Sequence, residues 1–184
     1  MIRRSSAAAV LLLFLAAGAA GCGGAGGGRP VDGPSSPLGE AAENLEECIP
    51  DPSMPSMTDG ITVLDNHSTG TVTVEHVSFY GDRHLRLVQA LVVPIGDNSV
   101  GYEPWPPTGS LLPGIQWSKR VPAVGATVPP SSAHGFRNLV IQMRPTARKA
   151  SSAGVEVLYR ENGQQYELRT HTKTLVVPNT KVDC

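Results

Sequence analysis

The sequence contains few aromatic residues, few cysteines and little net charge. Of its 184 residues, 5% are aromatic and three are cysteine, and the formal net charge at pH 7 is −1. A chain this close to neutrality has no basic excess with which to bind a phosphate backbone, so we expect no nucleic acid partner. Its main apolar run, residues 7–20, is shorter than the about 20 residues that a transmembrane helix needs.

Sequence motifs of catalysis are also missing. The chain has no His-Glu-x-x-His motif, no P-loop and no Gly-x-Gly-x-x-Gly between a strand and a helix. The nearest approach to a Gly-x-Ser-x-Gly nucleophile elbow is GDNSVG at residues 96–101, where Ser99 is out of position and a turn is the better interpretation. We therefore predict a protein that is not an enzyme and holds no cofactor, although dispersed residues can still assemble a site.

Histidines are few and widely spaced. None of them forms a His-x-His or His-x-x-x-His pair, so we interpret them as surface or turn residues and predict no metal site. Met54 and Met57 lie close to His67 in the sequence, and thioether and imidazole ligands together suit copper. A small-ligand or copper carrier is therefore the alternative function. The five histidines are His67, His76, His84, His134 and His171.

The N-terminal segment is typical of an export signal. Arg3 and Arg4 precede the apolar run, and the small residues Ala19-Ala20-Gly21 stand directly before Cys22. This segment resembles the lipobox of bacterial lipoproteins, although Ala19 stands where that family prefers leucine. The resemblance implies that residues 1–21 are removed as a signal peptide and that the sulfur of Cys22 is acylated. Ordinary secretion with a free Cys22 and a retained anchor helix are the alternatives.

A lipidated Cys22 would fix the location of the protein. Two or more acyl chains hold a protein stably on a bilayer, so we expect a chain anchored on the extracytoplasmic face of the cell membrane. Removal of residues 1–21 takes away two arginines and no acidic residue, so the net charge falls to −3 and no polybasic patch reinforces the anchor. Residues 23–37, rich in glycine, proline and serine, predict a flexible tether that reaches about 20 Å.

The cysteine count is odd, which is awkward in an exported protein. If Cys22 is lipidated, Cys48 and Cys184 remain, and export permits a disulfide between them. Such a bond would close a loop of about 137 residues, for which the chain-entropy estimate is roughly 4–5 kcal/mol. Two unpaired thiols are the alternative.

The segment LGEAAENLEEC at residues 38–48 has apolar residues at helical spacing, which predicts one short helix or a turn. We therefore expect residues 22–60 to hold the lipidated cysteine, the tether and this helix. Residues 61–184 are expected to form the folded domain.

The rest of the chain has the pattern of short strands separated by turns. The alternation in residues 71–79 shifts phase at Glu75-His76, which predicts a β-bulge. Residues 85–94 are apolar enough for a central strand that ends at a proline. A further strand is expected at 138–144, and two more are expected within 155–170 as a hairpin around Asn162-Gly163.

About seven short strands with almost no helix favour an all-β fold, an immunoglobulin-like β-sandwich, with an open barrel as the alternative. The strand spacing resembles that of the immunoglobulin-like or fibronectin-like modules of exported bacterial proteins. That resemblance implies an architecture and carries no function of its own.

Residues 95–137 are rich in proline and carry Tyr102, Trp105 and Trp117, the candidate binding residues. Long irregular segments are usually functional or disordered, and exposed aromatic rings give a large contact area at little entropic cost. The alternative is that Trp117 lies on a strand and fills the core, and that Trp105, between two prolines, does the same. The sequence thus predicts a lipid-anchored, non-catalytic binding or structural module, with an envelope protein or glycan as partner.

Overall fold

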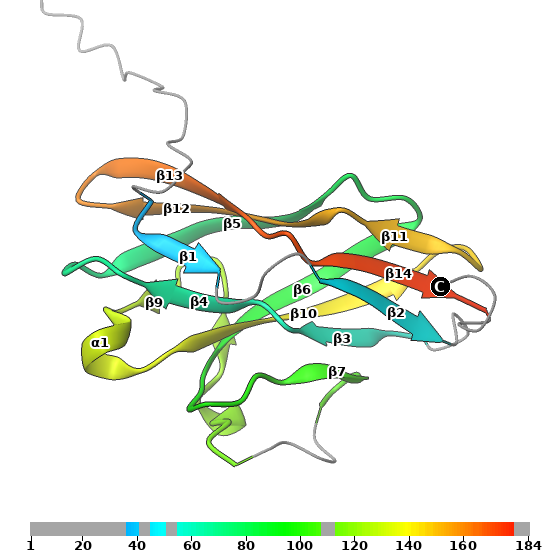
Figure 1. Ribbon diagram of the computed structural model, residues 1–184, viewed down its shortest axis with the longest axis horizontal. Helices are drawn as coiled ribbons and strands as arrows, with labels where there is room; N and C mark the ends of the chain where they lie inside the picture. The colour runs from blue at the N-terminus through cyan, green and yellow to red at the C-terminus, as the bar shows by residue number, and fades with distance from the viewer. Residues whose placement is uncertain (1–35, 41–44, 51–54, 108–112, 179–184) are drawn as a thin grey trace, which may run out of the picture.

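The chain folds into a sandwich of two β-layers (Figure 1). The computed structural model describes residues 36–40, 45–50, 55–107 and 113–178. Within these residues it has fourteen strands, one short α-helix, α1 (Ser131–His134), and one 3₁₀-helix, η1 (Trp117–Lys119). The predicted fold class, an all-β sandwich, is confirmed. No described helix has the length and apolar character that crossing a membrane would require.

One layer is a seven-stranded antiparallel sheet with β10 at its centre. β10 pairs with β6 along one edge, and along its other edge with β3 and β4, which follow each other end to end. β1 extends the sheet beyond β4, β7 extends it beyond β3, and β8 pairs with β6. The strands are β1 (Leu38–Glu40), β3 (Met57–Gly60), β4 (Val63–Asn66), β6 (Leu85–Pro94), β7 (Gly101–Pro104), β8 (Val121–Pro122) and β10 (Arg137–Pro145).

The other layer consists of two smaller sheets, which lie side by side in Figure 1. A four-stranded sheet has the order β13-β12-β5-β9, and a three-stranded sheet has the order β11-β14-β2, in which β2 runs parallel to β14. Their strands are β2 (Glu46–Pro50), β5 (Val72–Tyr80), β9 (Thr127–Val128), β11 (Ala150–Ser152), β12 (Gly154–Glu161), β13 (Gln164–Arg169) and β14 (Lys173–Val177).

Alternating side chains of β10 divide between two hydrophobic clusters. Leu139, Ile141 and Met143 are at most 1% exposed and belong to the main core between the layers. Val140 points to the opposite face of the sheet, where it forms a smaller cluster with Val93 of β6 and with residues of the proline-rich segment. Both faces of the seven-stranded sheet are therefore covered around its centre.

Two local predictions from the sequence are confirmed. The pairing of β5 with β12 passes from His76 directly to Val74, so Glu75 is the extra residue of a β-bulge at the phase shift. Asn162 and Gly163 both have positive φ, at 48° and 83°, in the two-residue turn between β12 and β13. The hairpin register therefore follows from the Asn-Gly turn.

The predicted helix at residues 38–48 is wrong. Residues 38–40 form β1, which pairs with β4, and residues 46–50 form β2, which pairs with β14; residues 41–44 lie outside the described residues. Pairing with distant strands overrides the helical spacing of apolar residues in so short a segment. Among the described residues, the sandwich already includes β1, so the domain boundary expected at residue 61 is too late. Residues 1–35, with the signal and most of the tether, lie outside the described residues.

The expectation of about seven strands, with residues 85–94 as a central one, also needs correction. β6 pairs fully with β10, but on its other edge it pairs with β8 only at Leu91 and Val92. Its apolar sequence reflects burial on both faces, since Val92 lies in the main core and Val93 in the smaller cluster. The strand count is higher because several strands are only two to four residues long.

Candidate functional site

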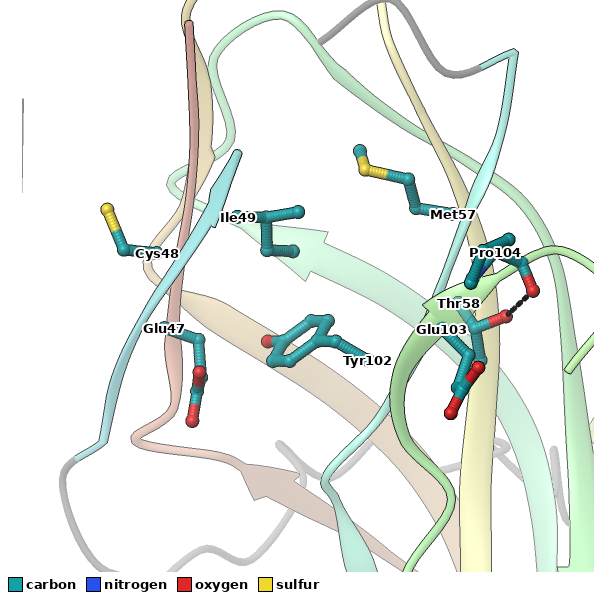
Figure 2. A pocket seen from close by; sticks show the side chains of 8 residues that line it. All are labelled: Glu47, Cys48, Ile49, Met57, Thr58, Tyr102, Glu103 and Pro104. Carbon is teal, nitrogen blue, oxygen red and sulfur yellow. Dashed lines mark hydrogen bonds between the residues drawn. The ribbon is translucent and has the colours of Figure 1, made fainter. Parts of the chain in front are cut away.

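An open pocket lies between β2 of one layer and the β3–β7 pair of the other (Figure 2). Its volume is about 240 Å³. Among the described residues, β2 pairs only with β14, so its other edge borders the pocket. The lining residues are Glu47, Cys48, Ile49, Met57, Thr58, Tyr102, Glu103 and Pro104.

Tyr102 crosses the space between the layers. It lies on β7 opposite Asp59 of β3, and its hydroxyl is 3.2 Å from Oγ1 of Thr174 on β14. At the start of β7, Gly60 pairs with Gly101, and a Cβ added at Gly60 would lie 2.6 Å from Cβ of Val100. Glycine is therefore required for β7 to approach β3 this closely.

The pocket has an apolar lining, and its charged lining residues are acidic. Ile49 and Met57 are 9% and 2% exposed, and Figure 2 shows Ile49 and the Tyr102 ring pointing toward each other. Glu47 and Glu103 are half-buried, and among the described lining residues none is basic. The pocket therefore suits ligands that combine an apolar part with a positive charge.

Burial determines the ionisation of Tyr102. Desolvation raises the pKa of its phenol well above the usual range, and the negative charges of Asp59 and Glu47 add to this effect, while the hydrogen bond to Thr174 opposes it. The phenol thus stays neutral at physiological pH and acts as a hydrogen-bonding group rather than as a base. This favours binding over acid–base chemistry at the pocket.

The structure separates the three predicted binding residues. Tyr102 packs against the main core, whereas Trp105 and Trp117 pack against the smaller cluster on the opposite face of the seven-stranded sheet. The two tryptophan rings meet edge to face with centroids 6.0 Å apart, and the guanidinium of Arg120 lies 4.9 Å from the Trp117 ring centroid. Both tryptophans are half-buried, and Trp117 begins η1, so the alternative of Trp117 on a strand in the core is wrong.

The histidines and cysteines form no common site in the described part of the chain. All five histidines are exposed, whereas Met57 is buried in the pocket. No group of three or more metal-binding side chains occurs among the described residues. Cys48 lines the pocket from β2, while Cys22, Cys184 and Met54 lie outside the described residues, so lipidation and the disulfide stay predictions.

Sequence reasoning missed the residues that surround Tyr102. Glu103 and Pro104 follow it directly in the sequence and could have been proposed with it. Glu47 could not, because it lies in the segment for which a helix was expected, and Ile49 follows that segment directly. Only the parallel pairing of β2 with β14 brings the two residues to the pocket.

Comparisons with known proteins add little. No family model matches the chain, and no curated protein matches it. One solved structure that it resembles is the ASH/PapD-like domain of human CEP192 (PapD-like domain 7), with 14% sequence identity and a TM-score of 0.38. The similarity covers 82% of this chain and 92% of that one. It is too distant to transfer any function.

Proposed function

We propose that the chain is a lipid-anchored, extracytoplasmic binding protein, and that the pocket at Tyr102 is its binding site. The observation that carries the binding part is the open pocket itself, in which apolar side chains from both layers surround a hydrogen-bonded tyrosine. Its partner is an envelope component, either a protein or a glycan.

The anchor part of the proposal rests on the sequence around Cys22. Acyl chains on this cysteine would hold the sandwich close to the bilayer, on the tether that ends at β1. Metabolic labelling with a fatty acid tests this: the wild-type protein should carry the label and the Cys22→Ala variant should not. A labelled band that persists in Cys22→Ala would refute lipidation at this position.

We further propose the Cys48–Cys184 disulfide. Cys48 pairs with Leu175 across neighbouring strands, and β14 ends at Val177, seven residues before Cys184. Seven extended residues span up to about 24 Å, so the bond is within reach. Peptide mapping without reduction should recover the two cysteines in one linked fragment, whereas two free thiols would exclude it.

Crosslinking in intact cells tests the binding part. A partner crosslinked to the wild-type protein should be lost with Tyr102→Ala and retained with Trp105→Ala, which changes the opposite face of the sheet. The thermal unfolding of both variants confirms that they fold. If Trp105→Ala removes the partner and Tyr102→Ala does not, the binding surface is the tryptophan pair and the pocket proposal is wrong.

A small-ligand or copper carrier is the second candidate, and the apolar lining of the pocket favours its small-ligand form. Elemental analysis of protein purified without a histidine tag tests the copper form. A stoichiometric copper content would support a copper carrier, and its absence would contradict one.

A further inference from the structure

We propose that the Tyr102 pocket binds a lysine side chain of a partner protein. The inference rests on the proposed function in taking this pocket as the binding site, and it goes further by naming the chemical group that enters. The four-carbon stem of the lysine would lie on the apolar lining, with its ammonium group toward Glu47 and Glu103.

The size of the pocket argues for a side chain rather than a free ligand. Sites for drug-sized molecules usually measure about 300–1,000 Å³, and this one measures about 240 Å³. It is an open pocket between the two layers. A single side chain can enter such a pocket while the rest of the partner stays outside.

The apolar lining suits an aliphatic stem. Ile49, Met57 and Pro104 supply hydrocarbon and thioether surface around the Tyr102 ring. Burial of methylene groups is favourable, methionine adapts its shape to the group beside it, and the face of a tyrosine ring attracts a cation.

The charges select a cation. In Figure 2 the carboxylates of Glu47 and Glu103 lie on the same side of the view, with Tyr102 between them. The neighbouring Glu46 does not line the pocket and faces Lys173, with an Nζ–Oε2 distance of 3.0 Å. The two half-buried carboxylates come from separate strands, β2 and β7, so they suit the divergent donors of an ammonium group better than the planar fork of a guanidinium.

A second pocket, along β5 and β6, shows the contrast. It is lined by His76, Asp82 and Arg86 among others, so its charged groups are of both signs. Such a lining selects neither cations nor anions, whereas every charged group that lines the Tyr102 pocket in the described residues is acidic.

The test uses the methyl group of Met57 as a reporter in the pocket. The expected mature chain, residues 22–184 with Cys22→Ser, is labelled with methyl-¹³C methionine and observed by NMR. The methyl signal that disappears in the Met57→Leu variant is assigned to Met57. Ac-Ala-Ala-Lys-Ala-Ala-NH₂ is then titrated beside two matched peptides, in which the lysine is replaced by norleucine or by Nε-acetyl-lysine. Met143, which is 0% exposed in the core, serves as the internal control.

We expect the chemical shift of the Met57 methyl group to change saturably with the lysine peptide, at a dissociation constant on the order of 1 mM. The chemical shift of Met143 should not change. The two uncharged peptides should bind at least about tenfold more weakly, and the double variant Glu47→Gln/Glu103→Gln should remove this difference. The control Asp82→Asn/Asp97→Asn changes the net charge equally at exposed positions away from the pocket and should retain the difference.

Several outcomes of these experiments would contradict binding of a lysine side chain. A Met57 signal that does not move, or that moves equally with the norleucine peptide, overturns the inference. If the crosslinked partner depends on Tyr102 under that outcome, the proposed function stands and only the lysine assignment is lost. Tighter binding of free hexylammonium than of the lysine peptide would also overturn it, because the site would then prefer a small free cation. Recovery of a glycan as the crosslinked partner would overturn the inference as well, because a glycan carries no lysine side chain.

Discussion

Two tyrosines span the sandwich from opposite layers, and their surroundings differ. Tyr159 of β12 reaches across to β1, where its hydroxyl contacts Ser36 and accepts a hydrogen bond from the Leu38 amide at 3.1 Å. Tyr102 of β7 reaches in the other direction, to Thr174 of β14. Burial raises the pKa of both phenols.

The difference lies in how completely each ring is enclosed. Tyr159 is 0% exposed and stacks on Tyr166, with ring centroids 5.5 Å apart. Tyr102 is half-buried and borders a cavity of about 240 Å³. The Tyr159 end of the sandwich is therefore filled by its own side chains, whereas the Tyr102 end leaves room for a side chain from another molecule.

Alanine substitution gives the largest expected difference between the two ends. Tyr159→Ala removes a fully enclosed ring, so we expect the free energy of unfolding to fall by about 3–5 kcal/mol. Tyr102→Ala enlarges a cavity that is already open to water, so a loss of about 1–2 kcal/mol is expected. Urea unfolding followed by circular dichroism measures both, and equal losses would show that the two ends are equally well packed.

The sequence predicted the Tyr159 end better than the Tyr102 end. Tyr159 lies in an alternating hairpin whose register follows from the local turn at Asn162 and Gly163. Its contact with Leu38 was nevertheless missed, because residues 38–48 were expected to form a helix. Local signals therefore predicted the strands but not which distant strands they meet.

At the Tyr102 end, the ring was proposed as a binding residue from its place in a proline-rich segment. The sequence could not show that Tyr102 and Trp105, three residues apart, belong to clusters on opposite faces of one sheet. That separation depends on the pairing of β7 with β3, a contact between segments about 45 residues apart.

Phenylalanine substitution isolates the two hydroxyls and should have a smaller effect. Tyr159→Phe removes the acceptor of a buried amide, that of Leu38, so we expect a loss of about 1–3 kcal/mol. Tyr102→Phe removes one side-chain hydrogen bond at a half-buried position, with an expected loss of about 0.5–1.5 kcal/mol. Thermal unfolding by calorimetry compares the two variants, and a larger loss for Tyr102→Phe would contradict the difference in enclosure.

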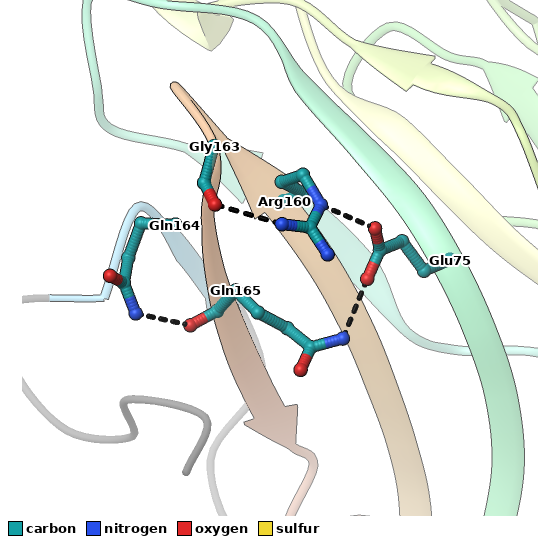
Figure 3. Close-up of polar contacts among 5 residues, drawn as sticks. All are labelled: Glu75, Arg160, Gly163, Gln164 and Gln165. Carbon is teal, nitrogen blue, oxygen red and sulfur yellow. Dashed lines mark hydrogen bonds and ion pairs between the residues drawn. The ribbon is translucent and has the colours of Figure 1, made fainter. Parts of the chain in front are cut away.

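The smallest expected effect concerns a carboxylate beside the Tyr159 hairpin. The bulge places Glu75 against Arg160, with an Nε–Oε1 distance of 2.6 Å, and against Gln165, whose Nε2 donates to Oε2 at 2.7 Å (Figure 3). These hydrogen bonds, with that of Arg160 first, hold the pKa of Glu75 below its ordinary value of 4.5. The carboxylate therefore fastens the bulge to both strands of the hairpin while it is ionised.

Because the pKa of Glu75 is lower in the folded chain than in the unfolded one, its contribution is fully present above pH 4.5 and is lost as the pH falls through the folded value. Glu75→Gln should thus cost no more than about 1 kcal/mol near pH 7, since the ion pair is solvent-exposed, and the difference from wild type should shrink below pH 4.5. The control Asp82→Asn removes an exposed carboxylate in a turn. Unfolding free energies measured from pH 7 to pH 3 compare the variants. A Glu75→Gln difference that grows toward low pH would mean that the carboxylate is stabilised in the unfolded chain instead, and that the bulge holds its register through the backbone alone.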